Sequence, residues 1–178
     1  MKRLFLLVLP LLFLLAPSLP GCVFHSSGPT GDAPSAGYSD SVARSNILAA
    51  LGNRDSAAAS CIEVFSFNRH VFLVGYAEKG LQSYALTAAQ GERGVRQVTH
   101  HWFTEPARDK MANARLAANI ESKLLFDSKI TAVQMNVSVN NGNVVLTGIV
   151  PDKKTAEEVV SLARQVRGVK DVTSYLAY

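Results

Sequence analysis

The stretch GNVVLTGIVPDKKTAEEVVSLARQVRGVKDVTSYL, residues 142–176, contains the pattern of a strand, a helix and a second strand. It begins inside an Asn141-Gly142 pair, which is a strong signal for a two-residue hairpin. Asp152 can cap the helix that follows. The expected buried stripe of this helix consists of Ala156, Val159, Val160, Ala163 and Val166. The stretch therefore predicts a helix packed on one face of a small sheet.

Residues on either side of this stretch complete a folding unit. Gly168 can take φ > 0 and end the helix, and Val169–Leu176 is typical of a final strand. Upstream, residues 107–125 are rich in helix formers, and Gln134–Asn140 alternates as a strand does. The apolar face of the upstream helix carries Leu116, Ile120 and Leu124. The predicted order is α-β-β-α-β.

The same unit occurs twice in the chain. The hexapeptide GVRQVT at 94–99 returns as GVKDVT at 168–173. Further matches lie in order at an offset of 73, among them Val64 with Val137, Leu73 with Leu146 and Gly75 with Gly148. Ordered matches over the whole length indicate a duplication rather than chance. The first copy departs from the second: Arg69 replaces the hairpin glycine, and its helices (39–51 and about 79–90) are expected to be shorter.

The second copy resembles the BON domain (bacterial OsmY and nodulation) family. The resemblance lies in the Val-x-Leu-x-Gly strand at 144–148, the Ala-containing helix, and the Gly-Val-x-x-Val ending at 168–172. It implies an α+β fold of two tandem domains, a divergent one at 39–104 and a second at 105–178. Each would be a small mixed three-stranded sheet covered by two helices.

The N-terminus is typical of a secretory signal, because Lys2-Arg3 precedes an apolar run that is too short to span a bilayer comfortably. Leu19-Pro20-Gly21-Cys22 resembles the bacterial lipobox. That resemblance implies a signal peptide at 1–21, cleavage before Cys22 and a lipid on its thiol. Val23 in place of Asp implies sorting to the outer membrane, facing the periplasm. An ordinary cleaved signal with a coincidental cysteine is the alternative.

Charge and cysteine content narrow the class of protein further. Residues 22–38 are rich in Ser, Gly and Pro and indicate a flexible tether. Without Lys2 and Arg3, 16 basic residues stand against 14 acidic ones, a net charge of +2. This argues against nucleic acid as a partner, which usually requires a concentrated basic patch. Two cysteines in different contexts offer no disulfide framework.

Residues that could support catalysis or bind a metal are scattered along the chain. His25 lies in the tether, His70 lies on a predicted strand, and the adjacent His100 and His101 would point to opposite faces of a strand. Cys61 is expected to be a small buried apolar residue on a strand, with intermolecular pairing in an oxidising periplasm as the alternative. Phosphate-loop, nucleophile-elbow and zinc-protease motifs are missing from the sequence. We therefore expect no active site, no metal site and no cofactor.

Partners would then carry the function, and helix 107–125 offers the clearest candidate surface. Its candidate phospholipid-binding residues are Arg108, Arg115 and Lys123 on a basic stripe, with Leu125 and Phe126 at its end. A basic stripe beside an apolar face can engage anionic headgroups. BON domains are considered phospholipid-binding modules, so the resemblance implies the same use. The alternatives are a solvated basic face and core packing of the two apolar residues.

Two functional interpretations follow. The first is a non-enzymatic outer-membrane lipoprotein that binds anionic phospholipid and supports envelope integrity, as the resemblance to dual-BON lipoproteins of envelope stress and division implies. The second is an adaptor for an envelope protein partner, docking through exposed strands or the surface between the copies. The linker between the copies is very short, which predicts that they pack together, with Trp102 and Phe103 as candidate interface residues.

Overall fold

The computed structural model describes residues 39–128, 130 and 134–178. The expected signal peptide (1–21), the tether (22–38) and Cys22 lie outside the described residues. The helices are α1 (Asp40–Arg54), α2 (Ser56–Ala59), α3 (Lys79–Gly91), α4 (Lys110–Leu125) and α5 (Lys153–Arg164). The strands are β1 (Ile62–Phe67), β2 (His70–Gly75), β3 (Gln97–Trp102), β4 (Gln134–Asn140), β5 (Asn143–Ile149) and β6 (Asp171–Ala177).

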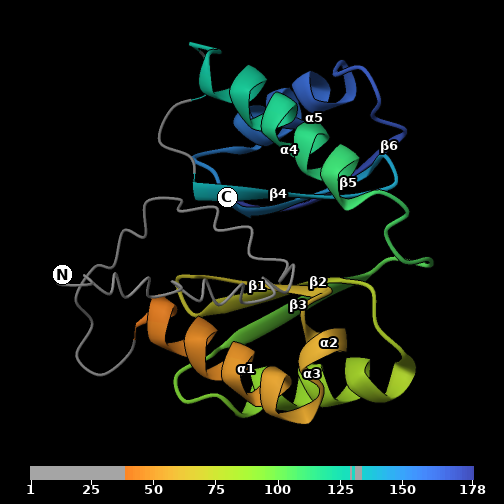
Figure 1. The fold of residues 1–178 in the computed structure, drawn as a ribbon. Coiled ribbons are helices and arrows are strands. Elements are labelled where there is room, and N and C mark those ends of the chain that lie inside the picture. The colour runs from red at the N-terminus through yellow and green to blue at the C-terminus, as the bar shows by residue number, and fades with distance from the viewer. Residues whose placement is uncertain (1–38, 129, 131–133) are drawn as a thin grey trace, which may run out of the picture.

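The duplicated α-β-β-α-β order is confirmed, with the short helix α2 as an addition in the first copy. One sheet has the order β1-β2-β3 and the other β4-β5-β6. In each sheet the first two strands form an antiparallel hairpin and the third lies parallel to the second. In Figure 1 the two sheets face each other, with α1, α2 and α3 below one sheet and α4 and α5 above the other. The molecule therefore has four layers, in the order helices, sheet, sheet, helices.

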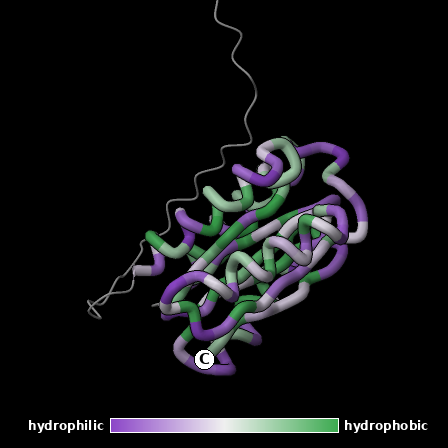
Figure 2. The backbone as a smooth tube through the Cα atoms, turned by 90° about the horizontal axis from the view of Figure 1, so that it is seen from below, coloured by the Kyte–Doolittle hydropathy of each residue, from purple (hydrophilic) through white to green (hydrophobic). Residues whose placement is uncertain are grey.

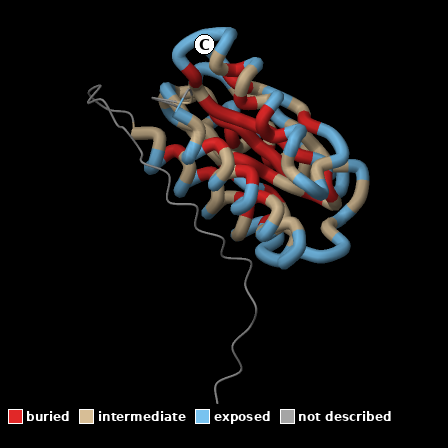
Figure 3. The backbone as a smooth tube through the Cα atoms, turned by 90° about the horizontal axis from the view of Figure 1, so that it is seen from above, coloured by how far each residue is buried: buried red, intermediate tan, exposed pale blue. Residues whose placement is uncertain are grey.

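Each copy has its own core between its sheet and its helices. In the second copy the core includes Ile120 from α4, Leu146 from β5 and Val159 from α5, all fully buried. In the first copy Ile47, Leu73 and Ala85 take corresponding places. Figure 2 shows apolar residues concentrated on the inner strands and inward helix faces, and Figure 3 shows that the central strands are the most buried segments.

The faces of the two sheets that point away from the helices pack on each other. Side chains alternate along a strand, so the neighbours of helix-facing Leu73 point to the other sheet. These neighbours, Phe72 and Val74, are 0% and 1% exposed, and in the second sheet Val145 is 1% exposed. The prediction that the two copies pack together is thus confirmed, and the surface between them is not available for an adaptor role.

The contacts across this layer relate the copies by an approximate two-fold axis. His101 and Tyr175 occupy equivalent positions, 74 residues apart, and they contact each other with ring centroids 5.9 Å apart. The Nδ1 of His101 lies 3.3 Å from the Tyr175 hydroxyl. Equivalent residues that touch each other are the mark of an isologous interface. Phe103 contacts His101 in this layer, but Trp102 packs into the first copy's own core, so its predicted interface role is wrong.

Three expectations about the first copy need correction. Helix α1 extends to Arg54 and has 15 residues against 16 for α4, while α3 has 13 residues against 12 for α5, so the second helix is not shortened and the first is shorter by only one residue. The hairpin is intact without a glycine, because Asn68 and Arg69 both adopt positive φ, 49° and 70°. Cys61 precedes β1 and is only half-buried.

Gly148 is the glycine with the most stringent requirement. Its φ is +139°, and an added Cβ would lie 2.1 Å from the carbonyl oxygen of Gln134 on β4. The close neighbour is the backbone of the adjacent strand β4, so glycine here permits the close pairing of the two strands. An added Cβ at Gly75 would likewise lie 2.2 Å from a backbone atom, the carbonyl oxygen of Cys61.

Replacing Gly148 by alanine is expected to destabilise the protein by roughly 3 kcal/mol or more, since the clash meets backbone rather than a flexible side chain. Gly52→Ala in α1 is the matched control, because no atom lies within 4 Å of its added Cβ. That control should gain about 0.5–1 kcal/mol. Urea unfolding measures both changes, and equal stabilities for the two variants would contradict the assignment.

Candidate functional site

A shallow basic groove of about 460 Å³ lies beside the first turns of α4. Three separate segments form it: the beginning of α4, the β4–β5 hairpin, and the turn after α5. Its basic residues are Arg108, Arg115, Arg167 and Lys170. The sequence pointed to the first two of these, but Arg167 and Lys170 were missed. Their signal was the Arg167-Gly168-Val169-Lys170 turn itself, which was read only as a helix stop.

Two close backbone approaches bring the hairpin against this turn. The N–H of Lys170 donates to the carbonyl oxygen of Gly142 at 2.8 Å. Gly142 has φ +90°, and an added Cβ would lie 2.9 Å from the carbonyl oxygen of Gly168. A side chain at position 142 would therefore collide with the backbone of the turn. The Asn-Gly hairpin permits this close approach and also determines the strand register.

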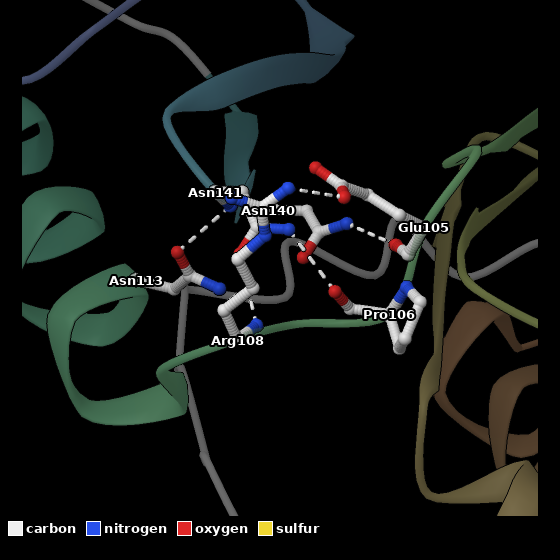
Figure 4. Close-up of polar contacts among 6 residues, drawn as sticks. All are labelled: Glu105, Pro106, Arg108, Asn113, Asn140 and Asn141. Carbon is white, nitrogen blue, oxygen red and sulfur yellow. Dashed lines mark hydrogen bonds and ion pairs between the residues drawn. The ribbon is translucent and has the colours of Figure 1, made fainter.

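The linker between the copies is fixed to the same hairpin, as Figure 4 shows. The side chain of Asn140 donates to the carbonyl oxygen of Glu105 at 2.7 Å, and that of Asn141 donates to Pro106 at 3.0 Å. The backbone N–H of Arg108 donates to the Asn141 side-chain oxygen at 2.9 Å. These bonds hold the start of α4 at a fixed position relative to the second sheet.

The basic residues of the groove differ in how far their charge is compensated. Arg108 forms an exposed ion pair with Glu105 at 2.7 Å, and this hydrogen bond lowers the pKa of the Glu105 carboxyl. Arg108 also lies before α4, whose N-cap is Asp109, so the prediction that it lies on the helix is wrong. Arg115 and Arg167 are exposed, and neither is in an ion pair with another described residue. They provide most of the uncompensated positive charge.

The equivalent place in the first copy is filled by the copy's own side chains. Asp40 takes the position of Asn113 and accepts hydrogen bonds from the backbone N–H groups of Asn68 and Arg69. Arg69 replaces Gly142, and its Nε donates to the carbonyl oxygen of Gly94 at 2.7 Å. An anionic group and a long side chain thus occupy the region that is open in the second copy.

The other predicted site residues lie away from the groove. Lys123 is half-buried, and its Nζ donates to Gln165 Oε1 on the turn after α5 at 3.0 Å. Leu125 and Phe126 are 79% and 83% exposed, so they do not pack in the core. They lie at the far end of α4, about 15 Å along the axis from Arg115. The five candidates therefore do not form one cluster.

One exposed stripe along α4 connects the groove with this apolar end. At 100° per residue, five exposed side chains lie within about 40° of Met111 on the helix surface. They are Met111, Arg115, Ala118, Ser122 and Leu125. The stripe is thus apolar and basic, without a carboxylate.

A second polar feature lies between the two sheets. The Ser138 hydroxyl donates a short hydrogen bond to the Glu63 carboxylate of the other copy. Glu63 as a whole residue is exposed on the edge strand β1, but its carboxylate lies against Ser138 of the other sheet and is partly shielded from water. This burial raises the pKa of Glu63, opposed by the Ser138 hydrogen bond and assisted by the charge of Glu121. Burial also lowers the pKa of His70 and of His101 in the same layer.

Glu63→Gln is expected to stabilise the protein at pH 7 relative to the unchanged chain. A raised folded pKa means that the folded state holds the proton more tightly, so stability falls as pH rises from about 4.5 through the folded pKa. Glutamine mimics the protonated carboxyl and removes this loss. Urea unfolding between pH 4 and 8 measures the free energy of unfolding of the variant and of the unchanged protein. The difference between the two isolates the effect of position 63, because the histidines contribute equally to both proteins. Parallel stability profiles would contradict the prediction, and Glu157→Gln on exposed α5 is the control.

The histidines and the thiol do not converge. His100 contacts Trp102 on the helix side of β3, whereas His101 contacts Tyr175 across the sheets. Within residues 39–128, 130 and 134–178, no group of three metal-ligating side chains could hold an ion. In the same ranges no helix is long and apolar enough to cross a membrane.

Comparison with known proteins gives consistent matches. A family model described as the BON domain matches residues 39–101 and 112–178. The osmotically-inducible protein Y of Escherichia coli K12 is 27% identical over 143 residues, which cover 77% of this chain and 71% of that protein. The outer membrane lipoprotein DolP of Haemophilus influenzae is 27% identical over 124 residues. The 21 kDa hemolysin of Actinobacillus pleuropneumoniae is 29% identical over 124 residues. Each of these last two matches covers 66% of this chain and 62% of the relative, which is less than two thirds of its length.

Proposed function

Because the chain belongs to the BON-domain family, with BON domains at residues 39–101 and 112–178, we propose that it is a non-enzymatic envelope lipoprotein that binds anionic phospholipid through its second copy. The relatives named for osmotic induction and as an outer membrane lipoprotein support a role in the cell envelope. The observation that carries the lipid proposal is the basic groove next to the exposed stripe of α4.

The charges of the groove suit a phosphate-bearing headgroup. Arg115, Arg167 and Lys170 come from two segments and line one concave surface. Each Lys or Arg near an anionic bilayer contributes about 1 kcal/mol of attraction. Arginine can also hold a phosphate through two parallel hydrogen bonds. A headgroup in the groove would therefore meet both nonspecific attraction and directed donors.

The exposed stripe of α4 provides the apolar part of the contact. With Met111 63% exposed at one end and Phe126 83% exposed at the other, the helix can lie along the bilayer surface. Aromatic and aliphatic side chains at the headgroup level are typical of such interfacial helices. Leu125 and Phe126 therefore keep their proposed role, but as an apolar end separate from the headgroup site. Lys123 is committed to Gln165 and is expected to contribute least.

A vesicle-binding assay tests the proposal directly. The protein is mixed with phosphatidylcholine vesicles that contain increasing fractions of phosphatidylglycerol, and the bound fraction is measured by sedimentation. Binding should rise with the anionic fraction and fall as salt rises, because exposed charges are screened within about 8–10 Å at physiological ionic strength. Equal binding to neutral and anionic vesicles would contradict the electrostatic proposal.

The proposal also includes a lipid anchor on Cys22 that places the protein at the periplasmic face of the outer membrane. Cys22→Ala is expected to leave an uncleaved precursor without label when cells are grown with radiolabelled palmitate, since the acceptor thiol is gone. Cys61→Ala is the matched control and should keep both cleavage and label. Palmitate incorporation into the Cys22 variant would contradict the anchor.

A further inference from the structure

Strand β6 leaves one edge of the second sheet open. Among the described residues it pairs only with β5. The strand carries one charged residue, Asp171 at its start, and no lysine or proline. Natural edge strands usually carry such residues, or a bulge, to prevent another strand from pairing. This edge lacks those protective side chains.

The direction of the free backbone groups can be read from two hydrogen bonds. The carbonyl oxygen of Ala177 accepts from Val150 N–H at 2.8 Å, so the peptide groups of Ala177 and of alternate residues before it point to β5. The backbone N–H and C=O groups of Val172, Ser174 and Leu176 then point away from β5, toward the open edge of the sheet. The Leu176 N–H reaches only its own neighbour, the Ser174 hydroxyl, at 3.4 Å.

A groove of about 710 Å³ runs beside this edge, between β6 and α5. Its apolar side chains are Ala156, Val160, Leu176 and Tyr178. At one end lies Arg164, the last residue of α5, which is exposed and in no ion pair with another described residue. At the other end the charge of Lys153 is matched by Glu157 at 3.6 Å. Polar side chains, among them Ser161, Gln165 and Ser174, lie between these apolar ones. The groove therefore offers apolar contacts from both β6 and α5 and is positive at the end where β6 begins.

The first copy differs at the corresponding place. Trp102 occupies the position of Leu176 and packs against the core of that copy. His100 occupies the position of Ser174 and lies with its ring centroid 5.9 Å from that of Trp102. Large rings thus lie on the helix side of β3, at positions where β6 has the smaller Ser174 and Leu176.

We propose that β6 and α5 form a docking site for an extended protein segment that adds to the second sheet as a fourth strand. Its backbone would pair with the outward groups of Ser174 and Leu176, and its alternate apolar side chains would enter the groove. A carboxylate near the end of the segment beside the start of β6 would pair with Arg164. This site lies apart from the groove at α4 and does not depend on lipid binding.

Titration of the full-length protein, in nonionic detergent micelles, with the peptide acetyl-Asp-Val-Thr-Val-Thr-Val-amide and with its reversed sequence tests this proposal. We expect one of the two peptides to bind better, because Arg164 selects the end that carries the carboxylate. The N–H groups of Ser174 and Leu176 should gain protection from hydrogen exchange. Ser174→Pro, which removes an outward N–H at an edge position that tolerates proline, should weaken binding by about tenfold or more.

Two further variants separate the proposed contact from a loss of folding. Ser174→His places the first copy's residue at the edge and should also weaken binding, with circular dichroism unchanged. Arg164→Glu should lower the affinity for the preferred peptide by about tenfold and should abolish the difference in affinity between the two peptides. Failure of both peptides to bind, or protection confined to α4, would overturn the proposal, as would unchanged binding by the folded Ser174→His variant.

Discussion

Replacing Arg115 and Arg167 together by glutamate is expected to abolish binding to anionic vesicles. Each substitution removes a positive charge and adds a negative one on the same face of the groove. At about 1 kcal/mol per charge near the bilayer, the pair loses about 4 kcal/mol, or roughly a thousandfold in affinity. Arg108 is a weaker choice than the sequence suggested, because Glu105 already compensates its charge.

The duplication supplies a matched control for this experiment. Arg93 and Arg96 are the first-copy equivalents of Arg167 and Lys170, and both are exposed. Replacing both by glutamate changes the net charge by the same amount as the Arg115 and Arg167 double variant does. This replacement should nevertheless leave most of the vesicle binding intact. Arg44 is unsuitable as a control, since its Nε donates to the carbonyl oxygen of Val64 at 2.8 Å and its replacement would disturb the fold.

Two outcomes of this comparison would contradict the proposed site. Equal losses in the two double variants would show that total charge, rather than the groove, governs binding. Full binding by the Arg115 and Arg167 variant, with unchanged circular dichroism, would move the contact away from α4. Raising the salt should narrow the difference between the variants, because the attraction is between exposed charges.

Phe72→Ala is expected to lower the free energy of unfolding by about 3–5 kcal/mol, the usual cost of emptying a buried aromatic site. Phe72 is fully buried between the sheets, stacks on His70 with centroids 4.0 Å apart, and meets Phe67 edge-on at 6.1 Å. A loss of this size is a large part of the stability of a small protein. Both copies share this layer, so they should lose stability together.

Urea unfolding monitored by signals from each copy measures this effect. Phe126→Ala is the control, since that ring is 83% exposed and its removal should change stability by no more than about 0.5 kcal/mol. A Phe72 variant that keeps its stability would contradict the structural role of the layer. Independent unfolding of the two copies in the unchanged protein would contradict their coupling.

The sequence by itself determined the elements and their order, because these depend on local chemistry. The helix period, the alternation of Gln134–Asn140 and the hairpin at Asn141-Gly142 all act within a few residues. The positive φ of Gly168, 103°, follows from its place at the end of a helix. Duplication then carried the same order to the first copy, even where Arg69 replaced the glycine.

Only the tertiary structure decided what covers each buried face and which charges meet. The run Val71–Val74 is buried on both faces of its strand, and periodicity does not name the partner that covers each face. The groove joins Arg115 to Arg167 across 52 positions, and Glu63 meets Ser138 in the other copy. Such pairs depend on the packing of whole sheets and helices, because a local pattern reports that a side is buried or exposed and carries no information about distant segments.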